Sequence, residues 1–552
     1  MRLQTQARTR VARIAGSGDN ADTSEAPGAN NKDEGKDSGS ENTDETTPGS
    51  PSTPDTGSGA EGGNTGTGGT TEGGGTEGGG EIPSTPEAST DAAKIGETAY
   101  KTIAKAIEAA ESSNNTITLL RDVKENITID KSLTLDLAGF TLTGADEENA
   151  VVTITGSDDT KPTVTIKSSK IEEEKHVNGT ITGGRNPQNG GGFAIDSAVV
   201  RLEDLTITGN ETVGGDSNGE VGGGGIFALH ADVSMQNVTV SENSVTGSHS
   251  DGGGILVRYG SLTMDGCHVE GNTAPDCGGG MILRHSELNA TKSFFQNNTA
   301  PQGAGIYFND APGDAEEGCS GKHEHLIIDS TISGNTASNI GGGMYIGTIS
   351  NLTLRNSKLL NNDGASQGGA IVAYSVGAIE LDGVLISENR AESGAGILAL
   401  GTAVCNTDIR LLNGTVIDKN TATGSGGGIC ANASNINIAE NSALHNNTAA
   451  GMGGAIYANA SNVNIAANSA VYNNTATTAG DDLLFNGSTF TLPNAKDMSG
   501  DRILSSDKAE IIGWYHDGWF KWNAAANNGQ GGYEQIDRWT AETADEYTPV
   551  EK

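Results

Sequence analysis

One phrase recurs ten times between about residue 190 and residue 476 of this chain. A glycine cluster runs into Ile or Met, and a hydrophobic-x-x-Asn sequence follows it. In a clear copy, Gly-Gly-Gly-Ile at residues 252–255 precedes Val-Glu-Gly-Asn at residues 269–272. Most copies begin 25 to 29 residues after the previous one. A period of this length indicates a solenoid, whose units bury their apolar faces only by stacking on one another.

Each unit has the pattern of short strands rather than of a helix. Apolar runs of three to five residues, such as those at residues 255–258 and 262–264, are separated by Gly, Asn and Asp. Glycine supplies the positive φ that tight corners need. Three short strands per unit suit one coil of a β-helix and leave no room for a helix. The sequence therefore predicts an all-β fold.

The asparagine that closes each unit is expected to form a structural ladder. Asparagine tolerates the left-handed backbone region, and its amide can bond to the backbone or to the same residue one coil away. Each satisfied hydrogen bond contributes about 1 kcal/mol. Asn210 and Asn362 close two of the units. The other predicted rungs are Asn243, Asn272, Asn298, Asn335, Asn389, Asn420, Asn447 and Asn474.

The repeats resemble those of the polymorphic outer membrane proteins of chlamydiae, which carry the motifs GGAI and FxxN. Literal copies here are Gly-Gly-Ala-Ile at residues 368–371 and 453–456, and Phe-Gln-Asn-Asn at residues 295–298. The resemblance covers about half of the chain. It implies a right-handed parallel β-helix solenoid on a bacterial surface, acting in adhesion. The chain is also similar to the wider group of bacterial surface proteins with pectate-lyase-like β-helix domains.

The main repeats span residues 190–476. The sequence on either side of them predicts an N-terminal linker, a capping helix and a C-terminal aromatic segment. Residues 93–496 are expected to form the whole β-helix, closed at its start by a capping helix at about residues 99–111. Residues 1–92 are expected to be a disordered acidic linker, because Gly, Ser, Thr and Pro bury too little apolar surface. Residues 497–552 hold all four tryptophans and predict an aromatic cap or a small module.

The net charge of the chain restricts the classes of molecule that are expected to bind to it. The formal net charge is −38, and no basic patch with interleaved aromatics is present, so nucleic acid is not expected to bind. No run of 18 apolar residues predicts a transmembrane helix. We expect a cell-surface or extracellular location, with an export signal that is not visible in this sequence. A misplaced start and a protein that stays inside the cell are the alternatives.

The position after each Ile or Met anchor is the main candidate for ligand contact. Strand side chains alternate, so an inward anchor turns the next residue outward, and stacked coils then form an apolar and aromatic stripe. Such a stripe suits an extended glycan or a partner protein. Alternatively the stripe is covered, or the phase is wrong, and these residues are core. The candidates are Phe227, Tyr307, Tyr345, Tyr374 and Tyr457, with Arg258 and Arg284 at the edge and His230, Tyr259, His285 and Asp310 beside them.

No catalytic residue, metal ligand or cofactor is predicted. Asp481 and Asp482 resemble the paired aspartates of β-helix polysaccharide hydrolases, but the companion His and basic motifs are absent. These acids are expected to close the last coil. An insertion has metal-ligand chemistry without a standard spacing, and we interpret it as a solvated loop. Its candidate ligands are Asp314, Glu316, Glu317, Cys319, His323 and His325.

These observations together favour a surface-displayed, non-enzymatic β-helix that binds an extended glycan or a host or partner protein. A polysaccharide lyase or glycoside hydrolase on the same scaffold is the first alternative. A lyase would need clustered acids for Ca²⁺ and a basic residue on adjacent coils. A purely structural stalk is the second alternative.

Overall fold

The computed structural model describes residues 90–491, with gaps at residues 112–114, 158–159, 215–220, 249, 311–322, 348–350, 403–404 and 467–468, and also residues 514–517 and 535–536. The predicted linker, residues 1–92, and the predicted aromatic cap or module, residues 497–552, lie almost entirely outside the described residues.

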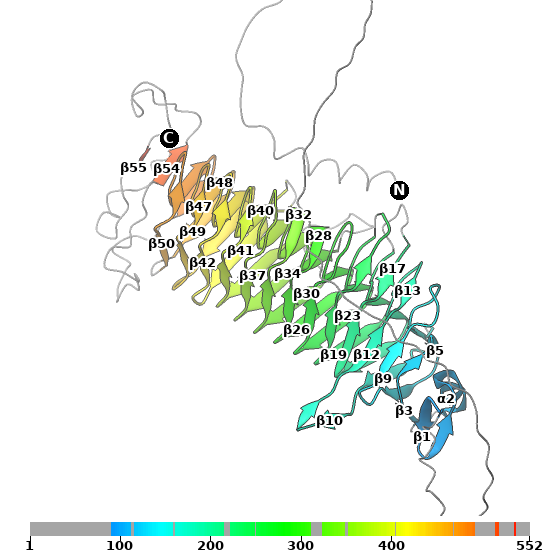
Figure 1. Ribbon diagram of the computed structural model, residues 1–552. Helices are drawn as coiled ribbons and strands as arrows, with labels where there is room; N and C mark the ends of the chain where they lie inside the picture. The colour runs from blue at the N-terminus through cyan, green and yellow to red at the C-terminus, as the bar shows by residue number, and fades with distance from the viewer. Residues whose placement is uncertain are drawn as a thin grey trace, which may run out of the picture. The chain divides into compact units, whose positions relative to one another are not determined.

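Stacked coils of parallel strands form the described part of the chain (Figure 1). One coil is β22 (Ile255–Arg258), β23 (Ser261–Asp265) and β24 (His268–Glu270), and each strand pairs in parallel with its counterparts in the coils before and after it. Within the described residues, repetition of this unit gives three long sheets of 16, 13 and 15 strands, here named sheets A, B and C. The predicted all-β, parallel β-helix solenoid is confirmed.

Sheet A contains β23, and its first strands pair antiparallel at the N-terminal edge. In spatial order its strands are β2 (Thr98–Tyr100), β1 (Ala93–Ile95), β3 (Thr116–Leu119), β6 (Leu133–Asp136), β9 (Thr163–Lys167), β15 (Val199–Glu203), β19 (Asp232–Gln236), β23, β26 (Glu287–Thr291), β30 (Glu324–Ile328), β34 (Asn351–Arg355), β37 (Ala378–Asp382), β41 (Thr407–Leu412), β45 (Ser434–Ile438), β49 (Asn462–Ile465) and β53 (Thr489–Thr491).

Sheet B contains β24 and leads into the asparagine corner of each coil. Its strands are β4 (Val123–Lys124), β7 (Thr141–Thr143), β12 (Gly179–Thr182), β16 (Leu205–Thr208), β20 (Thr239–Ser241), β24, β27 (Phe294–Gln296), β31 (Thr331–Ser333), β35 (Lys358–Leu360), β38 (Leu385–Ser387), β42 (Val416–Asp418), β46 (Ala443–His445) and β50 (Ala470–Tyr472).

Sheet C contains β22 and begins at the Ile or Met anchor in most coils of the main repeats. Its strands are β5 (Ile127–Ile129), β8 (Val152–Thr155), β14 (Phe193–Asp196), β18 (Ile226–Leu229), β22, β25 (Met281–Arg284), β29 (Ile306–Asn309), β33 (Met344–Gly347), β36 (Ile371–Tyr374), β40 (Ile397–Leu400), β44 (Ile429–Asn432), β48 (Ile456–Asn459), β52 (Leu483–Asn486), β54 (Trp514–Asp517) and β55 (Gln535–Ile536).

Short strands after the asparagine corner form smaller sheets. These are β13 (Arg185–Asn186), β17 (Glu211–Thr212) and β21 (Ser244–Val245); β28 (Thr299–Gln302) and β32 (Thr336–Ile340); and β39 (Arg390–Ala391), β43 (Thr421–Ala422), β47 (Thr448–Ala449) and β51 (Thr475–Ala476). A separate hairpin joins β10 (Ile171–Glu172) to β11 (Lys175–His176).

Alternation along the strands builds the core. In one coil Ile255 and Val257 point inward from sheet C, and Leu262, Met264 and Val269 meet them from sheets A and B, all at most 1 % exposed. The same pattern in every coil makes one continuous apolar column inside the solenoid. Each such side chain contributes roughly 1.5–3 kcal/mol when buried, so stacking is the main stabilising term.

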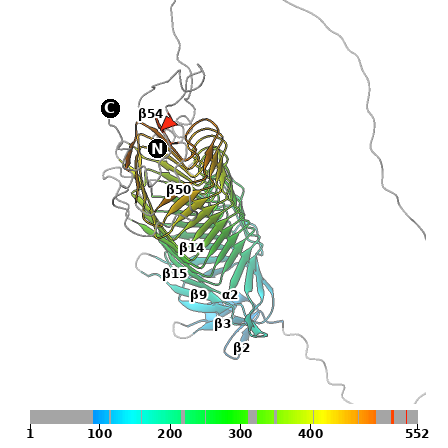
Figure 2. The same ribbon diagram turned by 90° about the vertical axis from the view of Figure 1, so that its left-hand side faces the viewer.

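Helix α2 (Ile103–Ala109) lies at the N-terminal end of the stack, within the predicted capping region (Figure 2). Thr102 caps it by accepting a hydrogen bond from the Lys105 backbone N–H, and the buried Ile103, Ala106 and Ile107 lie on one face. Contacts with β1, β2, β3 and β5 cover the first coil. The helix therefore shields the N-terminal edge, which would otherwise invite strand pairing.

Candidate functional site

Ten buried asparagines form an unbroken column among the described residues. From Asn210 to Asn447, each Nδ2 donates to Oδ1 of the ladder asparagine in the next coil, at 2.9 to 3.1 Å, and Asn474 is the last member. All ten side chains are at most 5 % exposed. The column includes every asparagine predicted as a rung from the repeat pattern. It fixes one corner of the coil rigidly.

A single rung shows why asparagine is required. Oδ1 of Asn243 accepts hydrogen bonds from the backbone N–H and Nδ2 of Asn210, both at 3.0 Å. Its Nδ2 donates to Asn272 Oδ1 at 3.1 Å and to the Ile207 carbonyl at 2.9 Å. The amide thus uses two acceptor and two donor positions, which leaves nothing unsatisfied in a buried corner.

Asp482 ends the ladder. Asn474 donates from Nδ2 to Asp482 Oδ1 at 2.8 Å, and the neighbouring Asp481 accepts from the Ala476 backbone N–H. Asp482 is fully buried. Both aspartates therefore take part in closing the coil, which is the role expected for this pair from the sequence.

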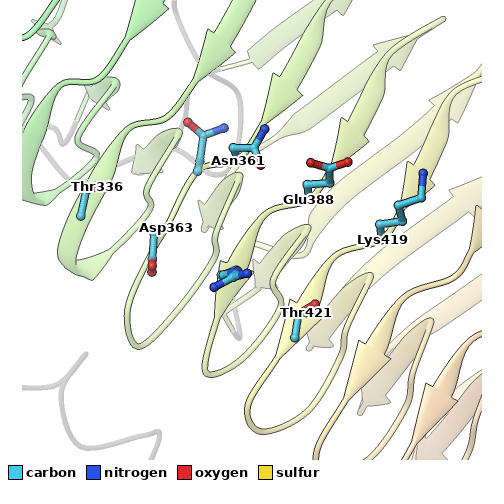
Figure 3. A pocket seen from close by; sticks show the side chains of 8 residues that line it. Thr336, Asn361, Asp363, Glu388, Lys419 and Thr421 are labelled. Atoms are coloured by element: carbon cyan, nitrogen blue, oxygen red, sulfur yellow. The ribbon is translucent and has the colours of Figure 1, made fainter.

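Two exposed columns flank the ladder. The residue before each ladder asparagine has a positive φ, as in Asn361 (53°), Glu388 (60°) and Lys419 (53°), which turns its side chain outward at the corner. The residue after the asparagine begins the short strand of the corner, as in Arg390 and Thr421. Side chains from both columns therefore project on either side of the buried amides (Figure 3).

A polar groove lies between these columns over four consecutive coils. Its volume is about 500 Å³. Asn362, a buried rung of the ladder, contributes to its lining. The other residues that line it are Thr336, Asn361, Asp363, Glu388, Arg390, Lys419 and Thr421, and all of these are exposed. We name this feature the ladder groove.

One cation of the ladder groove is held in place from behind. Lys419 Nζ lies 2.9 Å from Asp418 Oδ2, and His445 Nδ1 lies 2.8 Å from Asp418 Oδ1. The hydrogen bond to Asp418 raises the pKa of Lys419. Burial raises the pKa of Asp418, but hydrogen bonds from Asn446 and Lys419 and the charges of His445 and Lys419 outweigh it, so its pKa lies below the ordinary value. Lys419 is therefore cationic and positioned.

The other charged groups of the groove are not consumed by ion pairs within the protein. Among the described residues, no salt bridge links Asp363, Glu388 or Arg390 to an oppositely charged partner. Their hydrogen-bonding capacity is largely available to a ligand. The repeat pattern did not predict these residues. The signal that would have found them is their position directly before and after the ladder asparagine, where charged residues replace the Asn and Thr of adjacent units.

The predicted aromatic stripe has a different environment from the one expected. Phe227, Tyr307 and Tyr345 point away from the main core but are only 7 %, 9 % and 7 % exposed. They belong to a second buried apolar column, against which Tyr374 and Tyr457 pack while half-buried. The open surface stripe is therefore not present, and the alternative of a covered stripe holds.

The backbone of the glycine cluster covers the aromatic side chains on the outer face of sheet C. A Cβ added at Gly303 would lie 3.0 Å from Tyr307 Cβ, and one at Gly252 would lie 2.9 Å from Ile282 Cγ2. The backbone that carries these glycines thus folds back onto the outer face of sheet C. Ligand binding by the stripe stays a prediction, and it requires this segment to move away.

The two predicted edge arginines lie beside this second column. Arg284 forms a salt bridge with the fully buried Asp251, and its side chain is 15 % exposed. Burial lowers the pKa of Arg284, but the charge of Asp251 raises it above the ordinary value. The guanidinium carbon of Arg258 lies 5.8 Å from the centre of the Tyr259 ring. Arg284 is thus mainly committed to a structural ion pair.

An exposed ring stack runs along the corner after sheet C. The Tyr259 ring stacks between His230 and His285, with centroid distances of 5.5 and 5.1 Å. Tyr259 is 48 % exposed. Because the rings use their faces on one another, mainly ring edges are offered to solvent. The stack is therefore a weaker platform for sugar rings than an isolated aromatic face.

Two groups with metal-ligand chemistry do not make good metal sites. Ligand atoms of Asp251, Asp276 and Cys277 lie within 4.8 Å of one another, but the Arg284 cation already neutralises Asp251. The side chain of His325, in β30, is 1 % exposed, and its Nδ1 accepts a hydrogen bond from the Leu288 backbone N–H.

That hydrogen bond places the proton of the neutral His325 ring on Nε2, 4.0 Å from Asp310 Oδ2. A protonated Nε2 cannot ligate a metal. His323 lies nearby, with Nδ1 3.1 Å from Asp310 Oδ2. His325 is thus core rather than solvated loop, and the insertion's other candidate ligands, Asp314, Glu316, Glu317 and Cys319, lie outside the described residues.

None of the protein-family models, curated proteins or solved structures compared with this chain matches it. In the described part of the chain, no helix has the length and apolar character needed to cross a membrane.

Proposed function

We propose that this protein is a surface-displayed, non-enzymatic β-helix that binds an extended ligand, a glycan or a partner protein, along the ladder groove. The observation that carries the proposal is the set of polar side chains from four consecutive coils that line one groove over the rigid asparagine ladder. Solenoids commonly present such elongated surfaces to ligands. The resemblance of the repeats to chlamydial polymorphic outer membrane proteins and pectate-lyase-like surface proteins supports the same assignment.

The groove has the properties of a pre-formed site. Its floor is held by ladder bonds such as Asn362 Nδ2 to Asn389 Oδ1 at 3.0 Å, so binding costs little ordering of the backbone. Glu388 and Arg390 project from the two sides of the buried Asn389 in the same coil. A volume of about 500 Å³ lies within the range of typical ligand sites.

One observation favours the enzymatic alternative. Asp363 and Glu388 both line the groove, and a pair of carboxylates is what glycoside hydrolysis needs. A hydrolase or lyase on this scaffold is therefore the second candidate. Binding remains the first candidate, because both carboxylates are exposed to solvent, whereas a general acid in glycoside hydrolysis usually lies in an apolar pocket.

The full chain incubated with a panel of glycans and candidate surface proteins tests the proposal. We expect saturable binding without release of shortened products, weakened at least tenfold by Arg390→Gln. The matched control is Arg355→Gln, an exposed arginine on sheet A that pairs with Asp382. Product release that is lost in Glu388→Gln would favour the enzyme instead. Absence of any binding partner would leave the structural stalk.

A further inference from the structure

The formal charges of the ladder groove cancel. Among the lining residues, Asp363 and Glu388 supply two negative charges, and Arg390 and Lys419 supply two positive charges. Lys419 is also paired with Asp418 behind it, so the groove offers no excess of positive charge to a polyanion. The chain as a whole carries −38. A polyanion would meet both acids and the surrounding negative field, and a polycation would meet both bases. The groove therefore fits a ligand without net charge better than either.

The same side chains offer hydrogen-bond donors and acceptors in adjacent coils. The carboxylates of Asp363 and Glu388 accept hydrogen bonds, and the guanidinium of Arg390 donates them. The side chains of Asn361, Thr336 and Thr421 can donate and can accept hydrogen bonds. A hydroxyl group also both donates and accepts, so neighbouring hydroxyls of a sugar ring satisfy a carboxylate and a guanidinium together. Charge-assisted bonds of this kind are the stronger ones.

An extended peptide is a poorer match. Peptides usually add to a sheet edge through free backbone groups. Here the backbone N–H groups of Asp363 and Arg390 donate to the Asn335 and Asn362 carbonyls of the preceding coil, at 2.9 Å each. Their carbonyls accept from that same coil, the Asp363 carbonyl from Ala337 N–H and the Arg390 carbonyl from Gly364 N–H. Towards the following coil, the Asn389 carbonyl accepts from Thr421 N–H. The groove thus presents side chains rather than a strand edge.

The groove is open along the stack in both directions. Towards the N-terminus its two columns continue as Asn297 and Thr299, and towards the C-terminus as Asn446 and Thr448. These residues are small or uncharged and raise no charged wall across its ends. With coils about 4.8 Å apart, the four lining coils span roughly 14 Å. A ligand can therefore enter and leave the groove as a continuous polymer.

We infer that the ladder groove binds an internal stretch of a neutral, linear glycan that lies parallel to the coil stack. This inference rests on the proposed binding function. Glu388 and Asp363 accept hydrogen bonds from sugar hydroxyls, and Arg390 donates to hydroxyl and ring oxygens. Lys419, held by Asp418, positions the chain at the C-terminal side of the groove.

The experiment measures binding of the full chain to neutral linear oligosaccharides of increasing length, to a polyuronate and to a sulfated glycan, each at low and high salt. We expect the neutral glycans to bind, with affinity that rises with length until the groove is filled. Salt is expected to change this affinity less than twofold, because no net charge is neutralised. Blocking either end of the oligosaccharide is expected to have no effect.

Matched variants locate the site. Glu388→Gln and Arg390→Gln are each expected to weaken neutral-glycan binding at least tenfold. Glu242→Gln serves as control, because Glu242 occupies the same corner position (φ 54°) beside Asn243 and lies outside the groove. Both glutamates are exposed, so neither variant is expected to alter folding, and circular dichroism checks this.

The remaining outcomes distinguish failure of the neutral-glycan inference from failure of the proposed binding role of the groove. Binding only to the polyuronate or the sulfated glycan, steeply weakened by salt and lost in Arg390→Gln, would overturn the neutral-glycan inference and keep the groove. A requirement for a free chain end would overturn the internal-stretch inference. Binding to none of these probes, or equal loss in Glu242→Gln and Glu388→Gln, would overturn both the inference and the role of the groove.

Discussion

Nδ2 of Asn474 donates to Oδ1 of the buried Asp482 at 2.8 Å, and this contact terminates the asparagine ladder. Every amide in the ladder donates towards the next coil, so the amide dipoles align and their donor end lies at Asn474. A carboxylate is the natural acceptor there, as an anion is at a helix N-terminus. At the opposite end, Asn210 Oδ1 accepts from the Gly184 backbone N–H at 3.0 Å.

The ladder terminus predicts a selective stability effect. Asp482→Ala removes the acceptor of both the Asn474 backbone N–H and its Nδ2, and two buried donors left unpaired should cost about 2–3 kcal/mol. Asp482→Asn keeps an acceptor oxygen and should cost about 1 kcal/mol or less. Chemical denaturation of both variants measures the difference. Equal costs for the two variants would contradict the acceptor role.

A rung in the middle of the ladder should be at least as sensitive. Asn362→Ala removes the acceptor of two Asn335 donors in a buried corner, and it also removes the side-chain donor to Asn389 Oδ1 and to the Ile332 carbonyl. This predicts a loss of about 2–4 kcal/mol in unfolding free energy. The neighbouring Asn361 is exposed at φ 53°, so Asn361→Gly is the control and should change stability by about 0.5 kcal/mol or less. A similar loss in both variants would show that the amide network is not the cause.

The covered aromatic column predicts a stability defect where an open stripe would predict a binding defect. Tyr345→Ala should destabilise the protein by about 3–5 kcal/mol, because Tyr345 is buried and stacks on Tyr307 at 4.7 Å between ring centroids. Tyr259→Ala, which removes an exposed ring, should cost about 1 kcal/mol or less. Thermal unfolding compares them. Wild-type stability of Tyr345→Ala would mean that this ring is not packed in solution.

His325 predicts a pH dependence. Burial lowers its pKa from 6.5 to about 4, against the opposing charge of Asp310. Because the folded pKa lies below the unfolded one, the unfolded chain binds the proton more readily between these values. The contribution of the neutral ring is therefore complete above about pH 6.5 and is lost as pH falls towards 4, by roughly 3 kcal/mol in total.

Comparing the stability of the wild-type protein with that of His325→Asn isolates the contribution of His325 to the pH dependence. His325→Asn keeps an acceptor for the Leu288 backbone N–H but does not titrate in this range. Stability curves of the two proteins between pH 7 and pH 4 should therefore converge as the pH falls. Parallel curves would show that His325 is not the titrating group.

Much of the fold could be predicted from the sequence, because every repeat unit carries the same residues at the same structural positions. The glycine cluster, the Ile or Met anchor and the closing asparagine each occupy one structural position, so a period of 25 to 29 residues and strand-length apolar runs predict stacked coils. The short capping helix was also predictable, since Ile103, Ala106 and Ile107 follow helical spacing. In the repeat units and in the capping helix, the local preferences of the residues favour the same structure that the fold adopts.

The candidate site was less predictable for two physical reasons. Alternation correctly turns Tyr307 and Tyr345 away from the main core, but sequence spacing cannot show that the glycine backbone returns to cover them. Glu388 and Arg390 each resemble ordinary surface charges within their own units. Only stacking places them beside the residues of the adjacent coils that complete the groove.

The sequence by itself determined the coil, because each repeated residue has a local structural role. Glycine stands at close backbone approaches, an apolar anchor fills the interior, and the asparagine amide can bond in four directions. The tertiary structure alone decided which outward residues are accessible. Accessibility depends on what lies across a coil and one coil away, and these neighbours are distant in sequence. That is why the aromatic column is buried while the residues around Asn389 line an open groove.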